Sequence, residues 1–308
     1  MLVVAALGGN ALLRRGESLD SESARRNAKV AAEALVTVAR AHRLVVTHGN
    51  GPQIGLLALQ SEAYRDVPSY PLDVLGAESE GMIGYLLEQE LGNALPEREA
   101  ASLLTQTVVA ADDPAFEHPT KPIGPVYEAE VAQRLVAERG WTVALDGVDS
   151  SDNERWRRVV ASPAPISIVE LHAIELLLAQ QVIVICAGGG GVPVVTDPSG
   201  NRHGVEAVVD KDLATSLLAQ QLGADLLLLL TDVAAVEIDW GTPDARPLRE
   251  TTVRELEQHP FAAGSMGPKV AAAISFVSNT GKPAAIGALA DATAIVNGTA
   301  GTQVRREP

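Results

Sequence analysis

The sequence predicts an α/β protein in which helices cover both faces of a mostly parallel sheet. Short apolar segments rich in Val, Ile and Leu alternate with longer segments whose apolar residues recur at helical spacing. The short segments lack a polar and apolar alternation, which is typical of strands buried on both faces. Glycine clusters follow three of them, as expected where an open parallel sheet binds a ligand at the carboxyl ends of its strands.

The elements can be placed in chain order. Six strands are predicted: Leu2–Leu7, Leu44–Thr47, Leu103–Val109, Val182–Ala187, Leu226–Thr231 and Ala284–Gly287. Three long helices are predicted among them: Ser21–Ala41, with Asp20 or Ser21 as its N-cap, Asp73–Leu91 and Asp212–Leu222. The alternation stops between about residues 112 and 165, a stretch with several prolines. We expect an inserted subdomain or lid there, within one domain spanning residues 1–308.

Composition favours a small-molecule ligand. The 308 residues carry a formal net charge of −15, which disfavours binding to nucleic acid or to an anionic membrane. No apolar run reaches the roughly 18 residues that a membrane helix needs, and the N-terminus does not read as a signal peptide. The single cysteine, Cys186, lies in an apolar run, so we expect a buried, unreactive thiol and a cytoplasmic protein.

The three glycine clusters are the first candidate site. They are Gly8-Gly9-Asn10, Gly49-Asn50-Gly51 and Gly188–Gly191, each directly after a predicted strand. Glycine lets backbone N–H groups approach an anion closely. Any one cluster could be a plain turn, but three at one sheet edge predict an anion-binding site.

Three lysines are candidate cations for that site. Lys121 lies between two prolines, Lys211 between two aspartates, and Lys269 at the end of a glycine-containing loop, whereas Lys29 and Lys282 are expected to be solvated surface charges. The G-x-x-x-x-G-K-[ST] loop is missing from the sequence, as are metal-ligand spacings and a G-x-S-x-G nucleophile turn.

Taken together, these segments resemble the amino acid kinase superfamily and, within it, the carbamate kinase family. The resemblance extends over nearly the whole chain, and the ordered set is far more specific than any one motif. The segments that carry it are Ala6–Leu12, Thr47–Gln53, Pro71–Val74, Gly81–Tyr85, Pro119–Pro125, Arg157–Val160, Ala187–Pro193, Asp210–Asp212, Leu230–Val233 and Gly264–Lys269. Glu78, Glu80, Ala164 and Ser167 depart from the family pattern.

The resemblance implies a fold and a reaction. The fold is a three-layer αβα sandwich with a central, mainly parallel eight-stranded sheet and a small protruding subdomain that carries Lys121. The reaction is reversible phosphoryl transfer, in which ATP and carbamate give ADP and carbamoyl phosphate. Fermenting cells run it backward to make ATP during arginine catabolism. Carbamate is already an anionic nucleophile, so the site needs no general base.

The resemblance also assigns roles to residues of this sequence. Lys211 and Lys269 neutralise phosphate oxygens, Lys121 reaches the acceptor side, and Asp212 orients the lysines and keeps them charged. The backbones that hold the phosphoryl group and the carbamate belong to Gly8, Gly9, Asn10, Gly49, Asn50 and Gly51. The positions expected to bind the nucleotide are Gly189, Gly190, Thr231, Asp232, Val233 and Met266.

The implied cofactor is Mg²⁺, bound through the ATP or ADP phosphates rather than by protein ligands, and the implied assembly is a homodimer. Two alternatives stay open at this point. One is another acid kinase of the same fold, with an acylamino acid, a phosphonate or a nucleoside monophosphate as acceptor. The other is a nucleotide-binding sensor that retains the fold without turnover.

Overall fold

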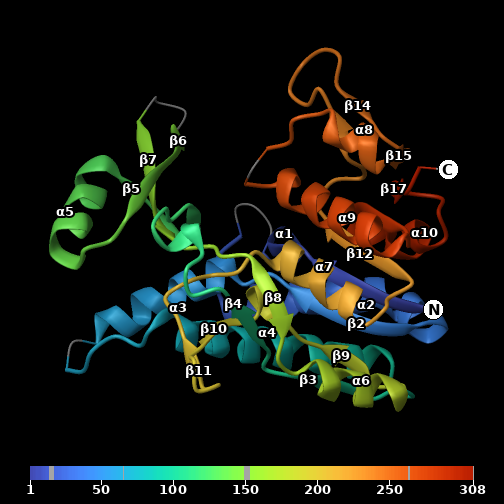
Figure 1. Ribbon diagram of the computed structural model, residues 1–308, viewed down its shortest axis with the longest axis horizontal. Coiled ribbons are helices and arrows are strands. Elements are labelled where there is room, and N and C mark those ends of the chain that lie inside the picture. Colours follow the sequence, from blue (N-terminus) through green and yellow to red (C-terminus); the bar gives the residue numbers. More distant parts are fainter. Residues whose placement is uncertain (14–16, 65, 149–152, 263, 308) are drawn as a thin grey trace.

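A large mixed sheet with helices on both faces forms the body of the molecule (Figure 1). The computed structural model describes residues 1–13, 17–64, 66–148, 153–262 and 264–307. The sheet has eight strands in the order β15-β17-β16-β12-β1-β2-β9-β3, and every neighbouring pair is parallel except β16 and β17. The predicted fold class is therefore confirmed. The strands are β1 (Leu2–Leu7), β2 (Arg43–His48), β3 (Ala100–Ser102), β9 (Ile183–Ile185), β12 (Leu226–Thr231), β15 (Glu250–Thr252), β16 (Ala284–Ala288) and β17 (Thr302–Arg305).

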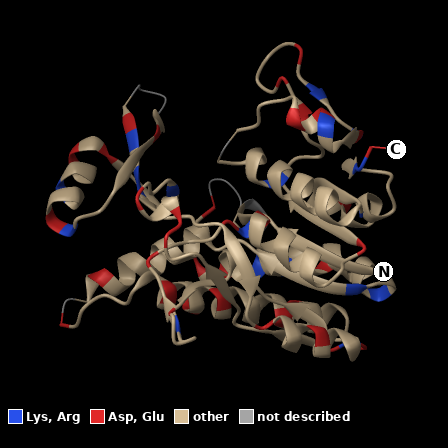
Figure 2. Ribbon diagram, in the orientation of Figure 1, with Lys and Arg blue, Asp and Glu red and all other residues tan. Residues whose placement is uncertain are grey.

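Two apolar cores lie on opposite faces of this sheet. In β1, Val3, Ala5 and Leu7 pack into one core, and the alternate residues pack into the other. The first core is covered by α2 (Ser21–Ala41), α4 (Leu72–Ala94) and α10 (Ala292–Val296), the second by α6 (Leu171–Ala179), α7 (Lys211–Gln221), α8 (Val253–Glu257) and α9 (Met266–Thr280). Figure 2 shows charged residues on the surface helices and almost none along the central strands. Burial on both faces explains why these strands show no polar alternation.

A smaller sheet corrects one predicted strand. The segment Leu103–Val109 does not form one strand, because β3 ends at Ser102 and β4 (Gln106–Val109) belongs to a different sheet. Between them, Leu103 still donates its N–H to Ile185 of the main sheet, whereas Thr105 accepts from Val192 of the smaller one. The smaller sheet has the order β11-β10-β4-β8, with β8 (Pro165–Ile168), β10 (Val192–Thr196) and β11 (Arg202–Gly204). A short hairpin pairs β13 (Glu237–Ile238) with β14 (Arg246–Pro247).

A three-stranded sheet with one helix projects from the body (Figure 1). It consists of β5 (Lys121–Glu128), α5 (Ala129–Arg139), β6 (Val143–Val148) and β7 (Glu154–Val160), in the strand order β5-β7-β6. These elements lie within residues 112–165, the stretch predicted as an insertion. Lys121 is the first residue of β5, so it lies at the base of this protruding unit.

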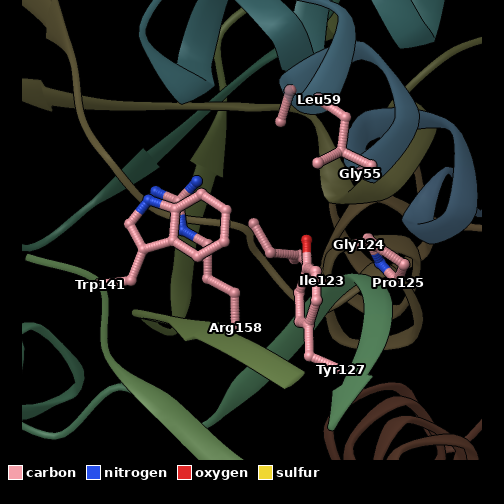
Figure 3. A pocket seen from close by; sticks show the side chains of 9 residues that line it. Gly55, Leu59, Ile123, Gly124, Pro125, Tyr127, Trp141 and Arg158 are labelled. Carbon is pink, nitrogen blue, oxygen red and sulfur yellow. The ribbon is translucent and has the colours of Figure 1, made fainter. Parts of the chain in front are cut away.

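The protruding unit meets the body at a close crossing of two backbones. An added Cβ on Gly55 of α3 (Gly51–Ala63) would lie 2.2 Å from Cα of Gly124 in β5, and Gly124 itself has a φ of +70°. Only glycine suits both positions. Figure 3 shows the hollow beside this crossing, where the Arg158 guanidinium stacks 4.7 Å from the Trp141 ring centroid. The crossing brings the base of the unit against α3, and the stack joins Arg158 of β7 to Trp141 within the unit itself.

Within the described ranges of the chain, none of the helices combines the length and apolar character that a membrane span requires.

Candidate functional site

Two of the predicted glycine loops touch each other at the carboxyl edge of the main sheet. Gly8 follows β1, and its N–H donates to the carbonyl of Leu230 at 2.9 Å. Gly49 follows β2, and an added Cβ there would lie 3.2 Å from Cα of Gly9 and 3.7 Å from Cε of Lys211. The two backbones and the lysine therefore form one compact group. Asn10 was predicted to belong to it, but its side chain lies outside the described part of the structure.

Two of the predicted lysines share the carboxylate of Asp212. Lys211 Nζ donates to Asp212 Oδ1 at 2.5 Å, and Lys269 Nζ donates to Oδ2 at 3.1 Å. Asp212 is 4% exposed, and burial alone would raise its pKa. The charges of Lys211 and Lys269 outweigh that effect and lower the pKa of Asp212 to about 2, so it remains a carboxylate. Burial lowers the pKa of Lys211, and the Lys269 charge adds to this, while Asp212 opposes it.

The third lysine, Lys121 of β5, reaches the N-terminus of α7, the helix that carries Lys211. Its Nζ donates to Asp210 Oδ2 at 2.6 Å. Asp210 is the N-cap of α7, and its other oxygen accepts from the backbone N–H of Asp212 at 2.9 Å and of Leu213 at 3.2 Å. All three predicted lysines therefore bind carboxylates at or next to the N-terminus of α7.

Two buried hydroxyl contacts fix α7 against its neighbours. Thr215 of α7 shares a 2.7 Å hydrogen bond with Thr47 of β2, and Ser216 donates to the carbonyl of Ala272 in α9 at 2.9 Å. The helix is thus tied to the sheet on one side and to α9 on the other. Because Lys269 lies in the first turns of α9, the same ties set its distance from Asp212.

The third glycine loop, Gly188–Gly191, packs against the β2 side of the edge. An added Cβ on Gly189 would lie 2.1 Å from the side chain of Asn50, and Asn50 donates to Ser79 Oγ at 2.8 Å. The loop follows β9, so β2 and β1 separate it from the end of β12. The structure therefore brings Gly189 together with Asn50, and places Gly190 against the carbonyl of Val209, away from the predicted nucleotide positions on β12.

Glu80 holds this loop in place. Its two carboxylate oxygens accept from the N–H of Gly188 at 2.8 Å and of Thr105 at 3.2 Å. Glu80 is almost fully buried, and this burial raises its pKa to about 8, although both backbone hydrogen bonds oppose the shift. From the sequence, Glu80 was noted only as a departure from the family pattern. Its hydrogen-bond partners, Thr105 and Gly188, lie 25 and 108 residues further along the chain, so the residues around Glu80 do not reveal its role.

His48 and Cys186 are two further buried titratable side chains near this edge. Burial lowers the pKa of His48 to about 4, which keeps the ring neutral, and its Nε2 is buried without a hydrogen-bond partner among the described residues. Cys186 is buried, and burial raises the pKa of its thiol. The buried, unreactive thiol predicted for Cys186 follows from this environment.

The remaining predicted nucleotide positions lie on the other side of β1. Thr231 ends β12, where its hydroxyl donates to Asp232 Oδ1 at 3.1 Å, and Asp232 and Val233 are exposed. Met266 opens α9. Along the carboxyl edge, the order is therefore the Gly188–Gly191 loop, the Gly49 loop, the Gly8 loop and the end of β12.

The acidic side chains of Asp210 and Asp212 at this edge bind lysines and backbone N–H groups. Over the ranges that the structure describes, no three His, Cys, Asp or Glu side chains come together as a metal site would need. At the edge itself, the oxygens of Asp210 and Asp212 are already engaged by lysines and backbone N–H groups. These carboxylates are therefore set up to hold lysines.

Comparison with known proteins identifies the family. The model of the amino acid kinase family matches residues 1–288. Carbamate kinase of Haemophilus influenzae is 52% identical over 100% of this chain and 97% of its own length, and that of Rhizobium meliloti is 54% identical over 98% and 92%. The solved carbamate kinase from Giardia lamblia bound to AMP-PNP is 41% identical, with a TM-score of 0.89 over 99% of this chain and 98% of its own. The chain belongs to the amino acid kinase family, in its carbamate kinase branch.

Proposed function

We propose that this protein transfers a phosphoryl group reversibly between ATP and carbamate, forming ADP and carbamoyl phosphate in one direction and ATP in the other. The observation that carries the proposal is the pair of lysines on Asp212, next to the glycine backbones of the β1 and β2 loops. Its close relatives over the full chain length are carbamate kinases, which are phosphotransferases. The site geometry suits a reaction that needs charge compensation and positioning.

The lysines supply the charge compensation. Lys211 and Lys269 lie on two different helices but are held by one carboxylate, so their ammonium groups stay close together despite their repulsion. We assign them to the oxygens of the transferring phosphoryl group, whose charge spreads over those oxygens in the transition state. Asp212 orients them and keeps them charged in a buried setting. Lys121, at the base of the protruding unit, is assigned to the acceptor side.

The glycine backbones supply the positioning. Gly8, Gly9, Asn10, Gly49, Asn50 and Gly51 are assigned to the phosphoryl group and the carbamate. Because Gly49 has no side chain, the β2 loop lies directly against Gly9 and beside the side chain of Lys211. Carbamate carries a negative charge of its own, so positioning it in line with the phosphoryl group is the main task.

The nucleotide is assigned to the β12 end of the edge. Thr231, Asp232, Val233 and Met266 are the proposed contacts, and Gly189 and Gly190 are proposed to act from the Asn50 side. Mg²⁺ is proposed to arrive with the nucleotide, since the carboxylates at the edge are already engaged by lysines. When bound, it offsets charge on the nucleotide phosphates.

Formation of ATP tests the proposal directly. Purified protein is mixed with ADP, Mg²⁺ and carbamoyl phosphate, and ATP is followed by luciferase luminescence. We expect ATP to form in proportion to enzyme, and acetyl phosphate to be a much poorer phosphoryl donor in the same assay. Absence of ATP from well-folded, Mg²⁺-supplied protein contradicts the proposal. A panel of acylamino acids, phosphonates and nucleoside monophosphates with ATP then tests the other acid kinases of this fold.

The cellular setting is proposed from the same resemblance. We infer a cytoplasmic homodimer that takes ATP or ADP together with carbamate or carbamoyl phosphate, and that makes ATP during arginine catabolism. A single buried thiol is typical of proteins from reducing compartments, and closed two-fold dimers are the commonest assemblies. Light scattering of the purified chain tests the dimer, and a mass of one chain contradicts it.

A further inference from the structure

Asp210 binds both the protruding unit and the helix that carries Lys211. Its Oδ2 accepts from Lys121 Nζ at 2.6 Å, across 89 residues of sequence. Its Oδ1 accepts from two backbone N–H groups of the first turn of α7. One carboxylate therefore fixes the start of α7 and, at the same time, the ammonium group on β5.

The backbone around this ion pair is already anchored. Lys121 pairs with Val160 in the ladder of β5 and β7, and the next residue, Ala161, pairs with Ala207 in a bridge to the segment that leads into α7. Val208 also donates its N–H to the carbonyl of Ala161 at 2.9 Å. Because these bonds hold the stem of the protruding unit, what Asp210 adds is the direction of the Lys121 side chain.

The charges explain why a separate carboxylate is needed. Both oxygens of Asp212 are engaged by Lys211 and Lys269. Without Asp210, Lys121 would face two other ammonium groups with no carboxylate of its own, and repulsion would drive it toward solvent. The side chains of Lys121 and Asp210 are 32% and 13% exposed, so water screens this pair only in part.

We propose that Asp210 is a positioning residue, which aims Lys121 at the acceptor side of the phosphoryl-transfer site through a contact separate from its N-cap role. This inference rests on the proposed function. In the site without substrate, Asp210 keeps the Lys121 ammonium next to the start of α7, within a short movement of an arriving carbamoyl phosphate. The substrate then takes over the ammonium group from Asp210.

Replacing Asp210 by Ser separates its two roles. Serine is as good an N-cap as aspartate, but it is neutral and too short to hold Lys121. We expect Asp210→Ser to melt near the wild-type temperature while its kcat/KM for carbamoyl phosphate falls by about tenfold or more, with KM for ADP changed less than about twofold. Asp210→Asn can still cap α7 and reach Lys121 but lacks the negative charge, so its kcat/KM should lie between those of wild type and Asp210→Ser. Asp20→Ser is the matched control, since Asp20 caps α2 through Ser23 and takes no part in the contacts of the three lysines.

A double-mutant cycle distinguishes positioning from a merely structural effect. Once Lys121 is replaced by Met, an intact Asp210 has no ammonium group to aim. In that background, Asp210→Ser should therefore change kcat/KM by less than about twofold. An equal loss in both backgrounds overturns the proposal, as does a single variant with wild-type kcat/KM. Higher activity in Asp210→Ser also overturns it, since Asp210 would then be restraining Lys121.

A chemical readout keeps this test separate from the proposed function. Each protein is methylated with formaldehyde and a mild reductant, and the modification of each lysine is followed by mass spectrometry. Release from Asp210 should speed modification of Lys121 by about threefold or more relative to exposed Lys29 in the same molecule. An unchanged ratio overturns the Asp210 proposal. If wild type makes no ATP while this ratio still rises, the proposed function fails and the Asp210–Lys121 contact stands.

Discussion

Replacing Lys211 by Met removes the ammonium group held closest to Asp212 and keeps a side chain of similar length. The Nζ of Lys211 lies 2.5 Å from Asp212 Oδ1, and its side chain is only 12% exposed. Lys269 remains on the other oxygen at 3.1 Å, so Asp212 is not left without a charged partner. The variant therefore tests one charge at the phosphoryl group with limited damage to the rest of the site.

The expected effects on rate and on stability are very different. Loss of one charged donor at a developing negative charge costs about 2–4 kcal/mol, which lowers kcat by about 30-fold to 1000-fold. For stability, the lost ion pair is offset in part because a charge no longer has to be buried, and burial already lowers the pKa of Lys211. We expect the melting temperature of the variant to move by no more than about 5 °C.

The assay is ATP formation from ADP and carbamoyl phosphate, with circular dichroism melts of the same samples. Lys29→Met serves as the control, because Lys29 is an exposed lysine of α2. It should match wild type in both measurements. If Lys211→Met retained kcat within about threefold of wild type, the ammonium group would not act on the transferring phosphoryl group, and the role assigned to Lys211 would be wrong.

Three further outcomes follow from the geometry. Gly55→Ala would place a Cβ 2.2 Å from Cα of Gly124, so β5 must shift and ATP formation should fall by about tenfold or more, whereas Gly76→Ala, in open space on α4, should match wild type. Since burial raises the pKa of Glu80 from 4.5 to about 8, its protonated form favours folding, and that stability is lost as the pH rises from about 5 to 8. Urea titrations should show that the free energy of unfolding of Glu80→Gln rises relative to that of wild type by up to about 1.4 kcal/mol for each pH unit in this range. A difference that does not change with pH would contradict the raised pKa of Glu80. Cys186 should resist Ellman's reagent in the folded protein and react once in urea, and rapid labelling without urea would contradict its burial.

The local sequence pattern predicted an element correctly where the element's own residues determine its burial and its cap. The strands predicted at Leu2–Leu7 and Leu226–Thr231 and the helix predicted at Ser21–Ala41 have the same bounds in the structure. In each strand the unbroken apolar run reflects burial on both faces of the sheet. In the helix, Asp20 accepts from the N–H of Ser23, which is the cap that the sequence indicated.

Local pattern failed where an element depends on distant partners. The residues around Leu103–Thr105 look like the middle of a strand, yet the chain leaves one sheet and enters another there. The bonds that redirect it go to Glu80, Ile185 and Val192, and no spacing within the segment reveals them. For the same reason the role of Glu80 could not be predicted, because in the sequence it is one more acidic residue of a helix.

The candidate site contains features that the local sequence predicts and features that depend on distant contacts. The glycine clusters and the lysines could be predicted because their residue types are unusual for their positions, between prolines, between aspartates or directly after a strand. Asp210 could be predicted as an N-cap from its place before α7, but its contact with Lys121 spans 89 residues and depends on how β7 meets the segment ahead of the helix. The order of elements along the chain does not predict that contact between β7 and the segment ahead of α7.

The balance of charge at the edge follows from how the carboxylates are shared. Three lysines bind two aspartates, and Asp212 serves two of them, so the cluster holds one net positive charge before any substrate arrives. A third carboxylate would make the cluster neutral and weaken its attraction for phosphate, whereas a single carboxylate would leave strongly repelling ammonium groups at close range. Sharing Asp212 keeps Lys211 and Lys269 together. In the function proposed above, a separate partner on the same helix lets the Lys121 ammonium group move to the substrate while the pair stays in place.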